Sequence, residues 1–153
     1  MGEIINLAQA TNIVKSGQKR VLVGGCFDII HLGHVTFLNK AKEMGDELWI
    51  ILESDVTVKK LKGEKRPINS QEDRAELLTN LRAVDYVVML PEMSTGEDYD
   101  QVLDCVKPDI IVITEGDRLE ERKTLQASKL KARLQIVPVV PNKSTSKIIE
   151  LLI

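Results

Sequence analysis

The stretch that decides the fold is VLVGGCFDIIHLGH, residues 21–34. Its apolar start, residues 21–23, has the composition of a buried strand, and a glycine pair follows. Both histidines of the 153-residue chain come next, at His31 and His34, where the helical pattern of residues 35–44 begins. Residues three apart on a helix are neighbours, and the unpaired N–H groups of a helix start favour an anion. The stretch therefore predicts a strand–loop–helix unit that handles phosphate.

Four further apolar runs follow, and they are as short as strands that are buried on both faces of a parallel sheet. They span residues 48–52, 86–90, 110–113 and 134–137. Helical patterns precede, separate or follow these runs, at residues 7–14, 70–78, 99–106, 124–132 and 144–152. This alternation predicts one α/β domain with a doubly wound parallel sheet of about five strands, whose ligands bind beyond the carboxyl ends of the strands.

Composition limits the classes of function. Hydrophobic residues make up 43% and charged residues 29% of the chain, as in an ordinary soluble protein, and the formal net charge of −2 argues against broad nucleic-acid affinity. No apolar stretch has the length of a membrane span, and the start of the chain lacks the apolar core of a signal peptide. Two cysteines are too few for a disulfide framework. We expect a cytoplasmic protein that binds neither nucleic acid nor membrane.

A second candidate phosphate site is the basic segment of residues 59–66, which holds five cations, Lys59 and Lys62 among them. It follows the second strand, so in a parallel sheet its loop lies at the same edge as the histidines. It could close over a polyphosphate, although a charge run is usually a solvated turn. Arg74, on the helix that Ser70 is expected to cap, is a further candidate phosphate contact.

Two more clusters lie at expected strand or helix ends. Ser144, Thr145 and Ser146 give the last helix a hydroxyl-rich start, and hydroxyls with bare N–H groups form an anion cradle. Gly116 and Asp117 follow the fourth strand. A carboxylate there could accept hydrogen bonds from a base or a sugar, or belong to a simple turn.

Other interpretations of the histidine segment stay open. The two rings could be exposed or could cap the helix, and a metal-binding pair lacks a third ligand nearby in the sequence. Cys26 could be a nucleophile served by His31, although it is more simply a small residue in a tight loop. Gly33 between the imidazoles is costly in a helix unless something must pack there.

Three motifs together resemble the cytidylyltransferase-like nucleotidyltransferase superfamily: GCFDIIHLGH at 25–34, VKKLKG at 58–63 and STSKI at 144–148. The resemblance runs from about Lys19 to the last residue. Within the superfamily, the heptose-1-phosphate adenylyltransferase domain of ADP-heptose synthesis is most similar, through residues 54–67. Archaeal-type FAD synthases and glycerol-3-phosphate cytidylyltransferases are similar in the same places.

The resemblance implies a Rossmann-like fold and transfer of a nucleotidyl group from an NTP, ATP in the most similar branch, to a phosphorylated small acceptor such as heptose 1-phosphate. His31 and His34 would stabilise charge at the α-phosphorus, and Lys62 would be catalytic beside them. Phosphates would also be held by Lys59, Ser144, Thr145 and Ser146. The remaining positions implied for the nucleotide site are Gly25, Cys26, Phe27, Asp28, Gly33, Arg74, Gly116 and Asp117.

The resemblance also implies Mg²⁺ on the triphosphate, without a metal site built from the protein, and a homodimer. We expect a single domain with an N-terminal helix in residues 1–18 and a catalytic core in residues 19–153. One departure is that the heptose branch usually carries a Lys-Gly-Gly-Asp-like run where this chain has TEGD at residues 114–117. A nucleotide-binding regulatory module without turnover is the alternative from a different class of function.

Overall fold

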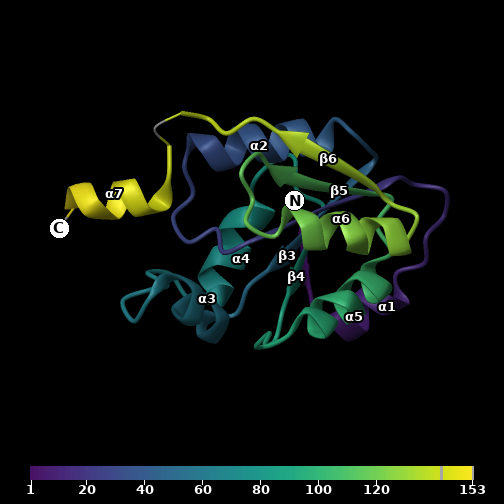
Figure 1. Cartoon of the computed structure of the whole chain (residues 1–153), viewed down its shortest axis with the longest axis horizontal. Coiled ribbons are helices and arrows are strands. Elements are labelled where there is room, and N and C mark those ends of the chain that lie inside the picture. Colours follow the sequence, from purple (N-terminus) through teal and green to yellow (C-terminus); the bar gives the residue numbers. More distant parts are fainter. Residues whose placement is uncertain (142, 153) are drawn as a thin grey trace.

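The structure is a computed structural model that describes residues 1–141 and 143–152. In it, the strand predicted at residues 21–23 lies inside a six-stranded parallel sheet (Figure 1). The strands are β1 (Glu3–Ile5), β2 (Arg20–Gly25), β3 (Glu47–Leu52), β4 (Tyr86–Met89), β5 (Ile110–Thr114) and β6 (Arg133–Val137). Their order is β1-β4-β3-β2-β5-β6, and every pair is parallel. The chain runs from β2 through β3 to β4 and then crosses to β5 on the other side of β2. Such sheets bind ligands at this switch point, beyond the carboxyl ends of the strands.

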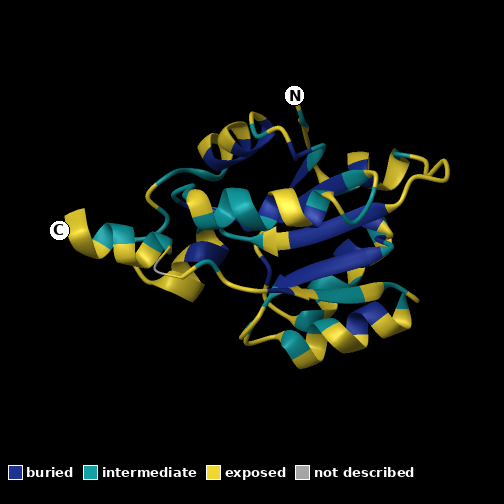
Figure 2. Ribbon diagram, turned by 90° about the horizontal axis from the view of Figure 1, so that it is seen from above, coloured by how far each residue is buried: buried dark blue, intermediate teal, exposed yellow. Residues whose placement is uncertain are grey.

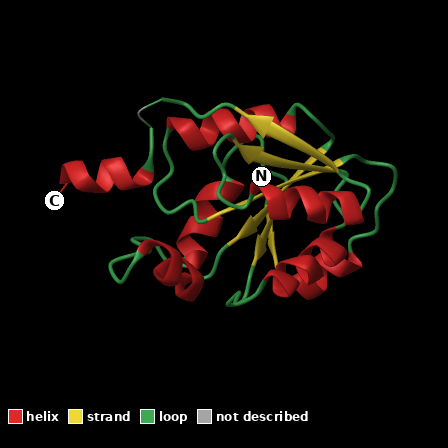
Figure 3. Cartoon of the chain, viewed as in Figure 1, coloured by secondary structure: helices red, strands yellow, loops and turns green. Residues whose placement is uncertain are grey.

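Helices alternate with the strands along the chain and cover both faces of the sheet (Figures 1 and 3). They are α1 (Leu7–Asn12), α2 (Leu32–Lys42), α3 (Asp55–Lys62), α4 (Gln71–Thr79), α5 (Gly96–Val106), α6 (Glu120–Lys129) and α7 (Thr145–Leu152). Side chains alternate along β2, as the pleat of a strand requires. Val21 and Val23 join a core with α2 and α4, and Leu22 joins a core with α1, α5 and α6. The doubly wound prediction is therefore confirmed.

The buried strands lie between exposed helical surfaces, and α7 extends away from this body (Figure 2). None of the α7 side chains is fully buried. None of the described helices combines the length and the apolar character that crossing a membrane requires.

Three sequence predictions need correction. The five predicted strands correspond to β2–β6, and β1 is an additional edge strand of three residues, too short to show a pattern. The glycine pair ends β2 and does not belong to the loop after it. The basic segment was expected as a loop, but its first lysines lie on the last turn of α3, which Ser54 caps and Gly63 ends with φ of 108°. The predicted cap of α4 is confirmed, because the Ser70 hydroxyl accepts from the Asp73 N–H.

Candidate active site

The two histidines meet at the start of α2, beyond the carboxyl end of β2. His31 is the N-cap residue, and its Nδ1 accepts from the Gly33 N–H at 3.0 Å. In a neutral ring this assigns the proton to Nε2, which then serves as a donor. The His31 and His34 rings stack with their centroids 3.9 Å apart. Gly33 permits this arrangement, because a Cβ there would lie 2.8 Å from Cε1 of His31 and 3.2 Å from Cβ of Lys143.

Both imidazoles are neutral at physiological pH. The pKa of His34 is lowered to about 4, mainly by burial and also by the neighbouring His31, while the Ile29 carbonyl acts in the opposite direction. Burial also lowers the pKa of His31, with a contribution from the charge of Lys143. In the described part of the chain, the buried Nδ1 of His34 has no hydrogen-bond partner.

The start of α7 lies against the histidine segment. The Thr145 hydroxyl donates to the Ile29 carbonyl at 3.0 Å, and Ser144 Oγ accepts from the Lys147 N–H at 3.1 Å. The structure thus brings the predicted hydroxyl cradle to the start of α2, where Lys143 also adjoins Gly33. Ser146, the third hydroxyl residue, is exposed.

Asp28 ties the loop after β2 to the segment after α3. Its fully buried carboxylate accepts from Nε of Arg66 at 2.7 Å and from the N–H groups of Ile68 and Asn69. Burial raises the pKa of this carboxyl, but the bonds from Asn69, Ile68 and Arg66 together hold it below its usual value. Asp28 therefore positions the site and does not face a ligand.

Arg74 is not a phosphate contact in this structure, and the expectation of one is corrected. Its side chain is completely buried. It donates to the carbonyls of Asn69, Cys26 and Glu53 and pairs with Asp55 at 2.7 Å. With four donors engaged, the guanidinium joins the loop after β2, the end of β3 and the start of α3, and so positions the elements around the site.

The Gly25–Phe27 segment supports the histidines. Phe27 has φ of 47°, which is uncommon for a residue other than glycine, and its buried ring lies 5.1 Å from the His34 ring. A Cβ on Gly25 would lie 2.9 Å from Cε2 of the Phe27 ring. The Phe27 ring therefore contacts His34 and, being buried, is not open to a nucleotide. Burial raises the pKa of the Cys26 thiol, and the opposing charge of Lys62 does not offset it, so the nucleophile hypothesis loses support.

The remaining predicted residues lie at the same edge of the sheet. Lys62 is exposed on α3 and lies near enough to Cys26 to influence its pKa. Lys59 pairs with Glu64 at 3.0 Å, and both side chains are exposed. Asp117 accepts from the Leu119 N–H and pairs with Lys123 at 2.7 Å, next to Gly116 with φ of 76°. These contacts fit the turn interpretation of Asp117.

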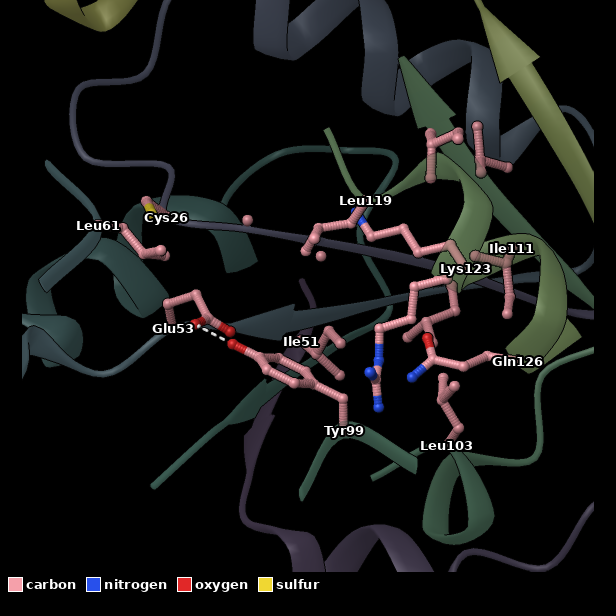
Figure 4. Close-up of a pocket in the computed structure, with 16 residues that line it drawn as sticks. Cys26, Ile51, Glu53, Leu61, Tyr99, Leu103, Ile111, Leu119, Lys123 and Gln126 are labelled. Carbon is pink, nitrogen blue, oxygen red and sulfur yellow. Dashed lines mark hydrogen bonds between the residues drawn. The ribbon is translucent and has the colours of Figure 1, made fainter. Parts of the chain in front are cut away.

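A cavity that the sequence analysis missed opens between the carboxyl ends of β2, β3 and β5 and the helices α5 and α6 (Figure 4). Its empty volume is about 880 Å³, part of which is open solvent. Gly25 and Cys26 form one wall. The signal available in the sequence was Glu53, an acidic residue placed directly after a buried strand at the ligand-binding edge.

The described residues contain no group of three or more histidine, cysteine, aspartate or glutamate side chains that could hold a metal ion. Mg²⁺ is bound in proteins by one or two carboxylates together with substrate phosphates more often than by a complete protein cage. Its delivery on a triphosphate stays a prediction.

The comparisons with known proteins agree with this geometry. Residues 22–151 match the family model described as cytidylyltransferase-like. The protein named Bifunctional protein HldE from Nitratiruptor sp. is 46% identical over 136 residues, which cover 89% of this chain and 28% of the relative. Its namesake from Helicobacter pylori is 44% identical over 137 residues, with 89% and 28% covered. The chain thus spans little more than a quarter of these relatives.

Solved structures extend the comparison to the fold. The lipopolysaccharide core biosynthesis protein from Thermoplasma volcanium is similar, with a TM-score of 0.67 and 30% identity over 83% of this chain and 100% of that one. Pantoate-beta-alanine ligase from Francisella tularensis also has a TM-score of 0.67, at 15% identity over 95% of this chain and 69% of that one, and so shares the fold. With the family model matching most of its length, this chain belongs to the cytidylyltransferase-like family of nucleotidyltransferases.

Proposed function

We propose that this chain transfers an adenylyl group from ATP to the phosphate of a heptose 1-phosphate and releases pyrophosphate. The observation that supports the proposal is the convergence of the α2 and α7 starts at the end of β2, through the Thr145–Ile29 hydrogen bond. Two helix starts with hydroxyls and imidazoles suit the several negative charges of a triphosphate. The relatives named HldE and the Thermoplasma volcanium protein of lipopolysaccharide core biosynthesis support a sugar phosphate as the acceptor.

In the proposed reaction, an oxygen of the acceptor phosphate forms a bond to the α-phosphorus. The bond from that phosphorus to the oxygen bridging the α- and β-phosphates breaks, and its electron pair leaves with pyrophosphate. The acceptor phosphate is already an anion, so no side chain needs to remove a proton. Catalysis then depends on positioning and on stabilising the charge that develops in the transition state.

The residues divide this work by their chemistry. His31 and His34, as neutral rings, would donate N–H hydrogen bonds to the oxygens at the α-phosphorus. Lys62 would neutralise the approaching acceptor phosphate, and Lys59 would add charge at the same edge. Ser144, Thr145 and Ser146 would hold the β- and γ-phosphates at the start of α7. Mg²⁺, bound by the triphosphate, would neutralise part of its charge.

One departure bears on the choice of substrates. Thr114 occupies the position where the heptose branch carries a cation. The next residue, Glu115, adds a carboxylate, which accepts from the Val139 N–H at 3.1 Å. For that reason two further reactions are candidates: transfer from CTP to glycerol 3-phosphate and transfer from ATP to FMN.

The test is pyrophosphate release from each of ATP, CTP, GTP and UTP, with Mg²⁺ and each acceptor in turn. The proposal expects the highest rate with ATP and heptose 1-phosphate, and no rate after chelation of Mg²⁺. A higher kcat/KM with CTP and glycerol 3-phosphate would replace the substrates and keep the reaction class. Nucleotide binding without pyrophosphate release for any acceptor would favour a regulatory module. The homodimer and the cytoplasmic location stay predictions, and light scattering in solution tests the first.

A further inference from the structure

The cavity beside the loop after β2 combines an apolar lining with a few polar side chains. It lies on the face of the sheet that α5 and α6 cover, opposite α2. Apolar side chains such as Ile51 and Leu103 form most of the lining, as in sites that bind small molecules. The polar side chains at its surface are Cys26, Glu53, Tyr99, Arg122, Lys123 and Gln126.

Glu53 and Tyr99 form a hydrogen-bonded pair in this cavity. The Tyr99 hydroxyl donates to Oε2 of Glu53 at 2.7 Å, across the gap between β3 and α5 (Figure 4). Glu53 is only 6% exposed, and among the described residues no other group donates to its carboxylate. Burial raises the pKa of Glu53, although Tyr99 and Lys123 act against it, and burial raises the pKa of Tyr99 as well. One carboxylate oxygen is therefore left without a donor inside an apolar cavity.

Positive charge lies on the α6 side of the same cavity. Lys123 reaches it while paired with Asp117. In the described part of the chain, Arg122 has no ion pair or hydrogen bond, and its guanidinium lies against Gly96, where a Cβ would be 1.4 Å from Nη2. An unpaired guanidinium is available to a ligand, because all five of its N–H groups are donors.

This arrangement selects a chemical class. A ligand group with positive charge would meet Arg122 and Lys123, and one with negative charge would meet Glu53. A neutral, hydroxyl-rich group avoids both conflicts, since its hydroxyls donate to the carboxylate and accept from the cations. The cavity also adjoins Cys26, in the loop that leads to the histidines.

We propose that Glu53, positioned by Tyr99, recognises the hydroxyl groups of a phosphorylated polyol acceptor, while Arg122 donates to oxygens of the same molecule. This inference rests on the proposed function, since it places the polyol in the cavity and its phosphate toward the reacting end of the loop. Glu53 and Tyr99 act as specificity-determining residues for the acceptor and leave the triphosphate site unchanged.

The test measures binding by calorimetry in the presence of a non-hydrolysable ATP analogue, with heptose 1-phosphate, glycerol 3-phosphate and phosphocholine as probes. Glu53→Gln keeps the shape and removes the charge, and should raise the Kd of heptose 1-phosphate by about 10- to 100-fold, as for a hydrogen bond to a charged group. Tyr99→Phe should raise it by about 3- to 10-fold. The Kd of the ATP analogue should stay unchanged in both variants.

Matched controls are Glu72→Gln on the exposed side of α4 and Tyr86→Phe, whose ring packs on Trp49 away from the cavity. Both should bind the probes as the wild type does, and melting temperatures establish that each variant is folded. The inference is overturned if neither cavity variant weakens heptose 1-phosphate, if no polyol phosphate binds to the wild type, or if phosphocholine binds more tightly than the polyol phosphates. Glu53-dependent binding without pyrophosphate release would leave the inference standing and reject the proposed function.

Discussion

The hydroxyl of Thr145 donates a hydrogen bond to the backbone carbonyl of Ile29 at 3.0 Å, across 116 residues of sequence. Ile29 lies two residues before His31, so this bond joins the start of the last helix to the segment that carries the histidines. The rest of α7 extends away from the body and buries none of its residues fully (Figure 1). The position of the hydroxyl cradle relative to the imidazoles therefore depends on a few contacts in the first turn of α7.

Thr145→Val removes this bond at nearly constant volume. We expect the KM for the NTP to rise about 3- to 10-fold, the value of one neutral hydrogen bond, while the KM for the acceptor changes little. Steady-state pyrophosphate release measures both constants. Thr145→Ser should restore the KM for the NTP. The control is Thr124→Val on α6, where the hydroxyl bonds only to its own helix. An acceptor constant that rises as much as the NTP constant would contradict the assignment of α7 to the triphosphate.

His34→Ala should lower kcat by about 100- to 1,000-fold, as the loss of a preorganised donor at the reacting phosphate does in other enzymes. The fold should persist, because His34 contributes stacking with His31 and contact with Phe27 but no described hydrogen bond from its buried Nδ1. The measurements are single-turnover rates and the circular dichroism melting curve. A folded variant with a near-normal rate would remove His34 from the mechanism.

The depressed histidine pKa values predict how stability depends on pH. His34 titrates near 4 when folded and near 6.5 when unfolded, so between these values the unfolded chain binds more protons. The contribution of His34 to the free energy of unfolding is then fully present above pH 6.5, and it is lost as the pH is lowered toward 4. For His34 the loss is about 3 kcal/mol. Glu53, with its raised pKa, acts in the opposite direction in the lower part of this window.

The comparison that isolates His34 is urea unfolding of the wild type and of His34→Asn at a series of pH values. The series runs from 7.5, above the window that the linkage relation defines, to about 4.5, inside it. The stability difference between the two proteins should shrink or reverse as the pH falls. A constant difference across the series would show that His34 is not the group responsible.

The core of the fold could be predicted from local pattern, because each buried strand is a short apolar run with a helical pattern after it. The β2 strand and the α4 cap at Ser70 were identified in this way. The edge strand β1 could not be, since three residues carry no period and its pairing with β4 is set by tertiary contact. Helix α3 was missed because its charge run dominates the segment, although Ser54 supplies a cap and Gly63 a stop.

The sequence predicted which residues lie near the site better than it predicted what each of them does there. Spacing and residue type located the histidines, Gly33 and the last helix start, and the structure shows what packs at Gly33. The roles of Asp28 and Arg74 could not be predicted, because burial decides whether a charged group faces a ligand or the protein, and burial is a tertiary property. The Glu53–Tyr99 pair joins elements 46 residues apart and left no local pattern.

Lys62→Ala tests the assignment of α3 to phosphate binding. We expect the KM of at least one substrate to rise about tenfold, because charge-assisted contacts to phosphate are among the stronger hydrogen bonds, with a smaller change in kcat. The matched control is Lys60→Ala on the same helix, where the lysine pairs with Glu92 at the surface. Unchanged constants for both substrates in Lys62→Ala would place this lysine outside the site.

Arg74→Lys tests the positioning role of the buried guanidinium. A lysine cannot reproduce the fork that bonds Asn69, Cys26 and Glu53 together with Asp55, so carbonyls buried around it would lose their donors. We expect a loss of about 2–4 kcal/mol in the free energy of unfolding, measured by urea titration, with Arg82→Lys on the surface as the control. A direct phosphate ligand would give a different result: stability close to the wild type and a selective rise in the KM of the NTP. Because Arg74 joins the loop after β2 to the end of β3, the variant should lower the affinity for both substrates together.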